Sequence, residues 1–186
     1  GDLGKRRPDL IAFVNGIPLV VVELKAIHAK VKNGYDGNIS DYKTTIPQLF
    51  WYNSLVIISN GLQSRLGTIS SKWEHFSEWP KYESEDESRA SKENALDTMI
   101  RGTCSAEKLI DIVENFVVYT ESFGAPTKII SKNHQYLGVN NAVEALNEIE
   151  KREGRLGVFW HTQGSGKSFS MLFFCQKILR KVPGDW

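Results

Sequence analysis

Three ionisable side chains near the start of the chain have the types and spacing that hydrolysis of a phosphodiester requires. Asp9 precedes the apolar run Leu10–Val14, and Glu23 and Lys25 follow the apolar run Ile17–Val22. Two converging carboxylates can hold one Mg²⁺, which keeps several waters and also takes substrate phosphate oxygens. A lysine beside the ion can orient a water or stabilise developing negative charge. The alternative is a hairpin with solvated polar ends, because a bare D-x₁₃-E-x-K spacing also arises by chance.

The loop between the two apolar runs decides whether the acids can meet. Asn-Gly at Asn15-Gly16 is a strong signal for a β-hairpin. Side chains alternate between faces along a strand, so a strict two-residue turn would point Asp9 and Glu23 to opposite faces. We predict a three-residue loop with Gly16 in a left-handed G1 bulge. This loop pairs Asp9 with Val21 and makes the two acids diagonal neighbours on one face.

A second candidate site lies near the C-terminus, in the segment HTQGSGKS at His161–Ser168. We expect a buried strand at Leu156–Trp160 before it and a helix at Phe169–Leu179 after it. A strand, a Gly-rich loop ending in Gly-Lys-Ser and a helix form the context of a nucleotide-binding phosphate loop. The alternative, a plain Gly-rich turn, does not explain the flanking strand and helix.

Each residue of this loop has a chemical reason to be there. Gly164, Ser165 and Gly166 would present backbone amides as an anion nest at a helix N-terminus. Lys167 would reach the β- and γ-phosphates of ATP, and the Ser168 hydroxyl would ligate the Mg²⁺ that accompanies the nucleotide. A His stands where the strict motif has its first glycine.

Further motifs between the two sites support a family resemblance. Gln48 and Tyr52 are four residues apart in a predicted helix at 38–53, which Pro47 interrupts. Pro8-Asp9, Glu23-Leu24-Lys25 and Gln48-x-x-x-Tyr52, in this order, resemble the PD-(D/E)xK nucleases that carry an additional Q-x-x-x-Y motif. With Asn60-Gly61 and the phosphate loop, the whole chain resembles the restriction (R, motor-nuclease) subunit of type I restriction-modification enzymes.

The resemblance implies a role for each of these residues. Asp9 and Glu23 would bind Mg²⁺, Lys25 would serve catalysis, and Gln48 and Tyr52 would support the site or touch DNA. In superfamily 2 helicases a glutamine ahead of the phosphate loop reads the adenine edge. By resemblance, Gln135 takes this role.

The activity implied by the resemblance is that of a type I site-specific deoxyribonuclease subunit. It would cut double-stranded DNA with Mg²⁺, coupled in the full protein to ATP-driven DNA translocation. Its partners would be modification (methyltransferase) and specificity subunits in the cytoplasm, without a membrane. Two alternatives stay open: another helicase-nuclease fusion of the DNA repair type, and a degenerate nuclease-fold scaffold without cleavage activity.

The elements that must position these residues indicate an α/β fold. We predict a PD-(D/E)xK nuclease core, with a mixed sheet flanked by helices, followed by the first β-α unit of a RecA-like P-loop domain. We place the nuclease domain at 1–125 and the start of the helicase motor at 126–186, with the break at Gly124-Ala125-Pro126. Further elements are expected as strands at 55–59 and 65–70 and as helices at 91–101, 105–119 and 140–152.

Composition sets the remaining bounds. The 186 residues carry a net charge of +1, so any contact with DNA must be local. Cys104 and Cys175 are expected to be reduced, buried thiols, and no apolar run reaches membrane-spanning length. No strand with an acidic pair follows the phosphate loop, and no helix bearing another acid precedes Gly1. We therefore expect weak nucleotide binding without hydrolysis, and an incomplete metal site, in this stretch alone.

Overall fold

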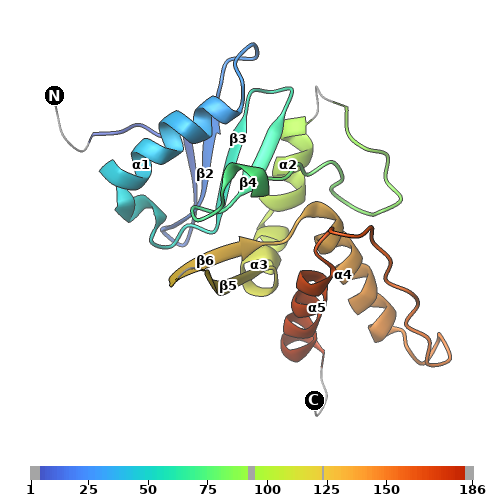
Figure 1. The fold of residues 1–186 in the computed structure, drawn as a ribbon. Coiled ribbons are helices and arrows are strands. Elements are labelled where there is room, and N and C mark those ends of the chain that lie inside the picture. Colours follow the sequence, from blue (N-terminus) through green and yellow to red (C-terminus); the bar gives the residue numbers. More distant parts are fainter. Residues whose placement is uncertain (1–4, 92–94, 123, 183–186) are drawn as a thin grey trace.

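The centre of the fold is a mixed four-stranded sheet in the order β1-β2-β3-β4 (Figure 1). The computed structural model describes residues 5–91, 95–122 and 124–182. β2 pairs antiparallel with β1 and parallel with β3, and β3 pairs antiparallel with β4. The strands are β1 (Leu10–Val14), β2 (Ile17–Leu24), β3 (Leu55–Ser59) and β4 (Ser64–Gly67). The expectation of a mixed sheet flanked by helices is therefore confirmed.

Helices cover both faces of this sheet, which explains why its central strands are apolar on both sides (Figure 1). Val21, Val56 and Ile58 face one apolar cluster with the helical run after the hairpin. The alternate residues, including Val20 and Val22, face the other cluster. The first face is covered by η1 (Gly34–Ile39, a π-helical stretch), α1 (Ser40–Thr45), η2 (Pro47–Phe50) and η3 (Trp73–His75).

The second face carries the remaining helices and a separate two-stranded hairpin. Its apolar cluster joins residues of the sheet to Ile112, Tyr136 and Phe173. The elements on this side are α2 (Ala95–Thr103), α3 (Ala106–Asn115), β5 (Val117–Ser122), β6 (Ala125–Ile130), α4 (Asn133–Asn147) and α5 (Lys167–Lys181). The helix expected after the phosphate loop is confirmed as α5.

The turn of the first hairpin differs from the prediction. Val14 pairs with Ile17 across a two-residue turn in which Asn15 (φ 50°) and Gly16 (φ 80°) both have positive φ, as in a type I′ turn. The predicted three-residue loop is wrong. The bulge lies further along the hairpin, where the register shifts between Ala12 and Phe13.

Pro18 gives a physical reason for this location. Phe13 pairs with Pro18 and Ala12 with Val20, so one residue of β2 is left over beside the proline. Proline has no backbone N–H to donate to a ladder, so an irregularity is least costly next to it. Past the bulge, Leu10 lies opposite Val22. Extending this register by one residue places Asp9 opposite Glu23, on the same face.

The strand expected before the phosphate loop does not form. The segment 156–160 is irregular, and its side chains are exposed, with Val158 at 93% and Trp160 at 76%. A strand needs a neighbour to satisfy its backbone N–H and C=O groups, and no strand pairing of the described residues includes this segment. The structure therefore confirms the helix of the predicted β-α unit but not its strand.

Three boundaries also differ from the prediction. The helix expected over 105–119 ends at Asn115, because Val117 and Val118 pair with Ile130 and Ile129 in the hairpin β5–β6. The helix expected from residue 140 starts at Asn133. Gly124, chosen as a domain break, lies with φ 76° in the turn of this hairpin rather than in a linker. The division into two domains itself stays a prediction.

Candidate active site

Asp9 and Glu23 meet at the open end of the β1–β2 hairpin, as the chemistry requires. Asp9 is exposed, and its Oδ2 accepts a hydrogen bond of 2.7 Å from the backbone N–H of Leu24. Glu23 is the second-last residue of β2. Its side chain lies on the face of the sheet that α1 covers, where Tyr42 contacts it, and is only 2% exposed. Burial raises the pKa of Glu23, and the charge of Asp9 adds a smaller contribution in the same direction. The bulge within the hairpin thus places Asp9 and Glu23 on one face, which the predicted loop was expected to do.

Lys25 lies on the same face, two residues beyond Glu23. Its Nζ donates to Glu23 Oε1 over 2.8 Å and to Asn38 Oδ1 over 2.7 Å. The side chain is 19% exposed, so its ammonium group is largely fixed by these two partners. The three predicted residues of the hairpin therefore form one cluster.

Two residues that sequence reasoning missed complete this cluster. Asn38, on η1, holds Lys25, and Tyr42, on α1, donates from its hydroxyl to Glu23 Oε2 over 3.3 Å. The Asn38 amide nitrogen lies 3.4 Å from the Tyr42 hydroxyl. The two residues are four apart, the same spacing as the predicted Gln and Tyr, with Asn in place of Gln. This spacing, directly after the hairpin, is the signal that could have identified them.

Gln48 and Tyr52 do not lie on one helical face. α1 ends at Thr45, the chain turns at Ile46 (φ −136°), and Pro47 begins the short 3₁₀ turn η2. Proline ends the helix because it lacks the N–H that the next turn needs. Gln48 is exposed and Tyr52 is 64% exposed, and neither side chain makes a hydrogen bond to another described residue. Their role in catalysis stays a prediction.

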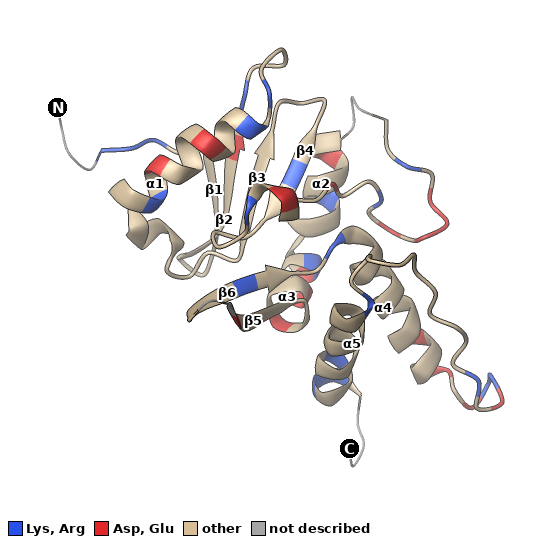
Figure 2. Cartoon of the chain, viewed as in Figure 1, with Lys and Arg blue, Asp and Glu red and all other residues tan. Residues whose placement is uncertain are grey.

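Burial sets the electrostatics of this cluster. Removal from water is the main reason why the pKa of Glu23 lies above its ordinary value, and the hydrogen bond and charge of Lys25 pull in the opposite direction. Burial likewise raises the pKa of the Tyr42 hydroxyl, so it remains a proton donor. Around the site, acidic and basic residues are interspersed along the helical run that contains α1 (Figure 2). A basic DNA-binding face is not formed by that helical run.

The donor set fits a hard divalent cation with few protein ligands. Among the described residues, no group of three or more His, Cys, Asp or Glu side chains converges as a metal cage. Mg²⁺ does not need such a cage, because it retains waters and accepts one or two carboxylates with substrate phosphate oxygens. Asp9 and Glu23 provide those two carboxylates, and a cation between them would offset the cost of the buried charge on Glu23.

The phosphate loop forms a compact turn before α5. Gly164 (φ 77°) and Gly166 (φ 90°) adopt left-handed conformations that other residues resist. Lys167 begins α5, and its Nζ donates to the carbonyls of His161 (2.9 Å) and Thr162 (3.1 Å). Ser168 is exposed in the first turn of the helix. The backbone has the bends expected of an anion nest, although the preceding strand is absent.

Gln135 lies directly beside this loop, although the helix that carries it begins earlier than predicted. Its side chain is buried (3% exposed), donates to the carbonyl of Gly166 over 2.9 Å and accepts from the N–H of Lys132 over 2.8 Å. The predicted residue is therefore near the candidate nucleotide site. That it reads adenine stays a prediction.

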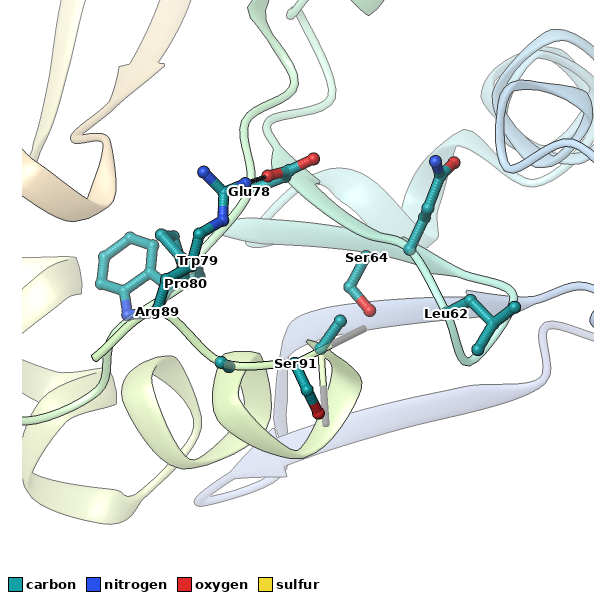
Figure 3. Close-up of a pocket in the computed structure, with 10 residues that line it drawn as sticks. Leu62, Ser64, Glu78, Trp79, Pro80, Arg89 and Ser91 are labelled. Atoms are coloured by element: carbon teal, nitrogen blue, oxygen red, sulfur yellow. Dashed lines mark hydrogen bonds and ion pairs between the residues drawn. The ribbon is translucent and has the colours of Figure 1, made fainter. Parts of the chain in front are cut away.

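A separate cavity of about 130 Å³ is lined by residues around the start of β4, by the segments 78–80 and 89–91, and by Ala95 at the start of α2 (Figure 3). Glu78 and Arg89 form an ion pair at its rim, and Arg65 contacts the same carboxylate. None of its lining residues belongs to the predicted sites. Cys104 and Cys175 are free thiols, but the prediction that both are buried is wrong: Cys104 is only partly buried and Cys175 is exposed.

Two family models match separate parts of the chain. Residues 2–75 match the family model described as the type I restriction enzyme R protein N terminus. Residues 134–185 match the model of the SWI2/SNF2 ATPase. Within the described residues no helix is long and apolar enough to cross a bilayer.

The chain is also similar along most of its length to curated proteins. It is 42% identical, over 95% of its length, to the type I restriction enzyme HindI endonuclease subunit of Haemophilus influenzae. It is 31% identical, again over 95% of its length, to a putative type I restriction enzyme endonuclease subunit, MjaIXP, of Methanocaldococcus jannaschii. The chain spans 17% and 18%, respectively, of these two relatives.

Proposed function

Because this chain belongs to the family of type I restriction enzyme R proteins, we propose that Asp9, Glu23 and Lys25 form a Mg²⁺-dependent centre for DNA cleavage. The observation that carries the proposal is the convergence of two carboxylates and an ammonium group at the end of one hairpin. Relatives named as endonuclease subunits support the same activity.

Asp9 and Glu23 would hold the ion, with Glu23 fixed by Tyr42 and Lys25. Bound Mg²⁺ would polarise the scissile phosphate of double-stranded DNA and lower the pKa of a water molecule. Lys25 would place its positive charge beside the developing negative charge of the phosphate. Asn38 keeps the lysine in this position, because its amide oxygen accepts from Nζ.

We further propose that Asn38 and Tyr42 take the supporting role that the resemblance assigned to Gln48 and Tyr52. Asn38 and Tyr42 have the same spacing and contact the cluster directly. Gln48 and Tyr52 are exposed and would remain available to touch DNA.

The second part of the proposed function is an ATP-driven motor that begins at the phosphate loop. The match to an ATPase family over residues 134–185 and the conformation of Gly164 and Gly166 support it. Ser168 would ligate the Mg²⁺ of ATP, with Lys167 at the phosphates. In the complete subunit, ATP hydrolysis would drive DNA translocation together with modification and specificity subunits. The 186 residues alone would bind ATP weakly and not hydrolyse it, since phosphoryl transfer needs further catalytic groups.

Single substitutions in the complete subunit, assembled with its partner subunits, test the cleavage centre. Asp9→Asn and Lys25→Ala should each lower the rate of plasmid cleavage by about 100-fold or more, because each removes a charge that acts on the transition state. ATP hydrolysis should stay near the wild-type rate. Asp36→Asn is a matched control, since this exposed acid lies outside the cluster and forms an ion pair with Lys32. Full cleavage by both variants would leave the degenerate scaffold as the better interpretation.

A parallel pair of variants tests the assignment of the supporting residues. Asn38→Ala should reduce cleavage by about 10-fold to 100-fold, as is typical when an outer partner of a metal site is removed. Gln48→Ala should alter DNA affinity without affecting the rate at saturating DNA. The reverse pattern, with Gln48 essential to the rate and Asn38 dispensable, would restore the original assignment from the Q-x-x-x-Y motif.

A further inference from the structure

Two consecutive side chains of α4 hold two consecutive carbonyl groups of the phosphate loop. His134 Nε2 lies 3.1 Å from the carbonyl oxygen of Ser165, and Gln135 Nε2 donates to the carbonyl of Gly166 over 2.9 Å. A carbonyl oxygen can only accept a hydrogen bond, so His134 must carry its proton on Nε2. Burial lowers the pKa of His134 and so favours a neutral ring, and the contact with Ser165 places its single proton on Nε2.

Because the peptide unit is planar, a contact that fixes the direction of a carbonyl group also fixes the direction of the N–H group in the same peptide. The C=O and N–H of one trans peptide point in opposite directions. The carbonyl of Ser165 shares a peptide with the N–H of Gly166, and that of Gly166 with the N–H of Lys167. Both N–H groups therefore point away from α4.

These amides are available for an anion. Among the described residues, the N–H groups of Gly166, Lys167 and Ser168 have no hydrogen-bond partner. They lie at the start of α5, where backbone N–H groups and the helix dipole favour negative charge. The side of the loop opposite His134 thus presents three donors.

The ring of His134 is itself held in place. It packs edge-to-face against His161, with ring centroids 4.8 Å apart, and His161 in turn packs edge-to-face with Phe159 at 4.5 Å. Its neighbour Asn133 exchanges two hydrogen bonds with the backbone of Lys81, which fixes the start of α4. A fixed donor can impose one peptide orientation, whereas a mobile donor could not.

We propose that His134 is a positioning residue of the phosphate loop, which holds the carbonyl of Ser165 so that the amide of Gly166 faces the bound phosphates. The inference rests on the proposed nucleotide site and adds a residue to it. His134 does not touch the nucleotide, and its contribution is to hold the loop in its binding conformation before ATP arrives.

Variants of His134 in the complete subunit separate the donor from the ring. His134→Phe keeps an aromatic ring against His161 but removes the donor, and His134→Gln places an amide N–H near the position of Nε2. The affinity for a fluorescent ATP analogue should fall about 10-fold for His134→Phe, as expected for one lost hydrogen bond. His134→Gln should stay within about threefold of wild type, and His75→Phe, at an exposed histidine, should bind normally.

Steady-state kinetics provides a second readout that a purely structural role would not give. In His134→Phe the KM for ATP should rise more than kcat falls, with the thermal unfolding temperature close to that of His134→Gln. Equal loss in both variants, or normal binding by His134→Phe, would overturn the inference. Lys167→Ala separates the proposed nucleotide site from the proposed role of His134. If this variant no longer binds ATP, the nucleotide site is supported whatever the result for His134. If this variant binds ATP normally, both proposals fail.

Discussion

At the scale of single residues, Glu23 is the group on which the candidate cleavage centre depends. It is buried, yet it accepts hydrogen bonds from Lys25 and Tyr42 and lies opposite Asp9. Burial favours its neutral form, whereas catalysis with Mg²⁺ requires the charged form. The lysine favours the ionised form of this carboxylate, and a bound divalent ion would do the same.

This conflict predicts a pH-dependent stability. The pKa of Glu23 lies above its ordinary value of 4.5 in the folded chain, so the native state binds this proton more tightly than the unfolded state. The protonated Glu23 therefore contributes to the free energy of unfolding. This contribution is fully present below the ordinary pKa and is lost as pH rises through the raised pKa. Without divalent ions, the free energy of unfolding of the wild type should therefore fall relative to that of Glu23→Gln over this range.

Urea denaturation of both proteins at a series of pH values measures this difference. Addition of Mg²⁺ should reduce the pH-dependent fall in the free energy of unfolding of the wild type, because the ion favours the charged carboxylate. The free energy of unfolding of Glu23→Gln should not change. A difference between the two proteins that does not depend on pH would contradict the raised pKa.

At the scale of elements, the close approach of η1 to the sheet brings Asn38 to Lys25. Gly34 permits this approach: a Cβ at this position would lie 2.7 Å from Ile58 Cγ2 and 3.1 Å from Lys25 Cε. A methyl group at this position would displace either η1 or the side chain of Lys25. Gly37, on the same stretch, has open space around its Cα.

These two glycines form a matched pair for mutation. Gly34→Ala should lower the free energy of unfolding by about 1–3 kcal/mol through overpacking and should reduce cleavage, because Lys25 is displaced. Gly37→Ala should be neutral or stabilising by about 0.5–1 kcal/mol, since alanine favours helix. Thermal denaturation and cleavage assays on both variants check this. Equal effects of the two substitutions would mean that helix propensity, and not the contact with Lys25, is what matters.

At the scale of the whole molecule, the two candidate sites lie on opposite faces of the sheet, because Glu23 contacts Tyr42 on one face and Phe173 of α5 packs into the apolar cluster on the other. One apolar cluster includes Val22 of the sheet, Ile112 of α3 and Phe173 of α5. Beside it, Lys177 Nζ of α5 contacts both oxygens of Asp111 on α3, at 2.6 and 2.7 Å. The helix that follows the phosphate loop is thus packed and ion-paired against the part of the chain that covers the sheet. Any coupling between the two candidate sites would therefore have to pass through the sheet.

Lys167→Ala tests that coupling. Loss of the ammonium group should abolish ATP hydrolysis and translocation in the complete subunit, because the phosphates lose their main counter-charge. Far-ultraviolet circular dichroism should be unchanged, since Lys167 is exposed. Cleavage of DNA should fall with translocation. Lys151→Ala, at an exposed lysine, is the control. Cleavage at the full rate by Lys167→Ala would show that the cutting centre works without the motor.

The sequence by itself determined the local parts of both sites. Apolar runs bounded by Asn15-Gly16 specified the first hairpin, and the run at 55–59 specified β3, because burial of β-branched residues is a local pattern. The Gly-rich segment before α5 specified the bends at Gly164 and Gly166. The residue types Asp9, Glu23 and Lys25 favour a metal-dependent centre.

Only the tertiary structure decided which residues meet. The bulge beside Pro18 sets the register of Asp9 against Glu23, and contacts across 13 or more residues bring Asn38 and Tyr42, rather than Gln48 and Tyr52, to the acids. The apolar segment 156–160 has the pattern of a strand, but it pairs with no strand in the described part of the chain. Register, helix docking and strand pairing depend on partners distant in the chain, so local patterns leave them undetermined.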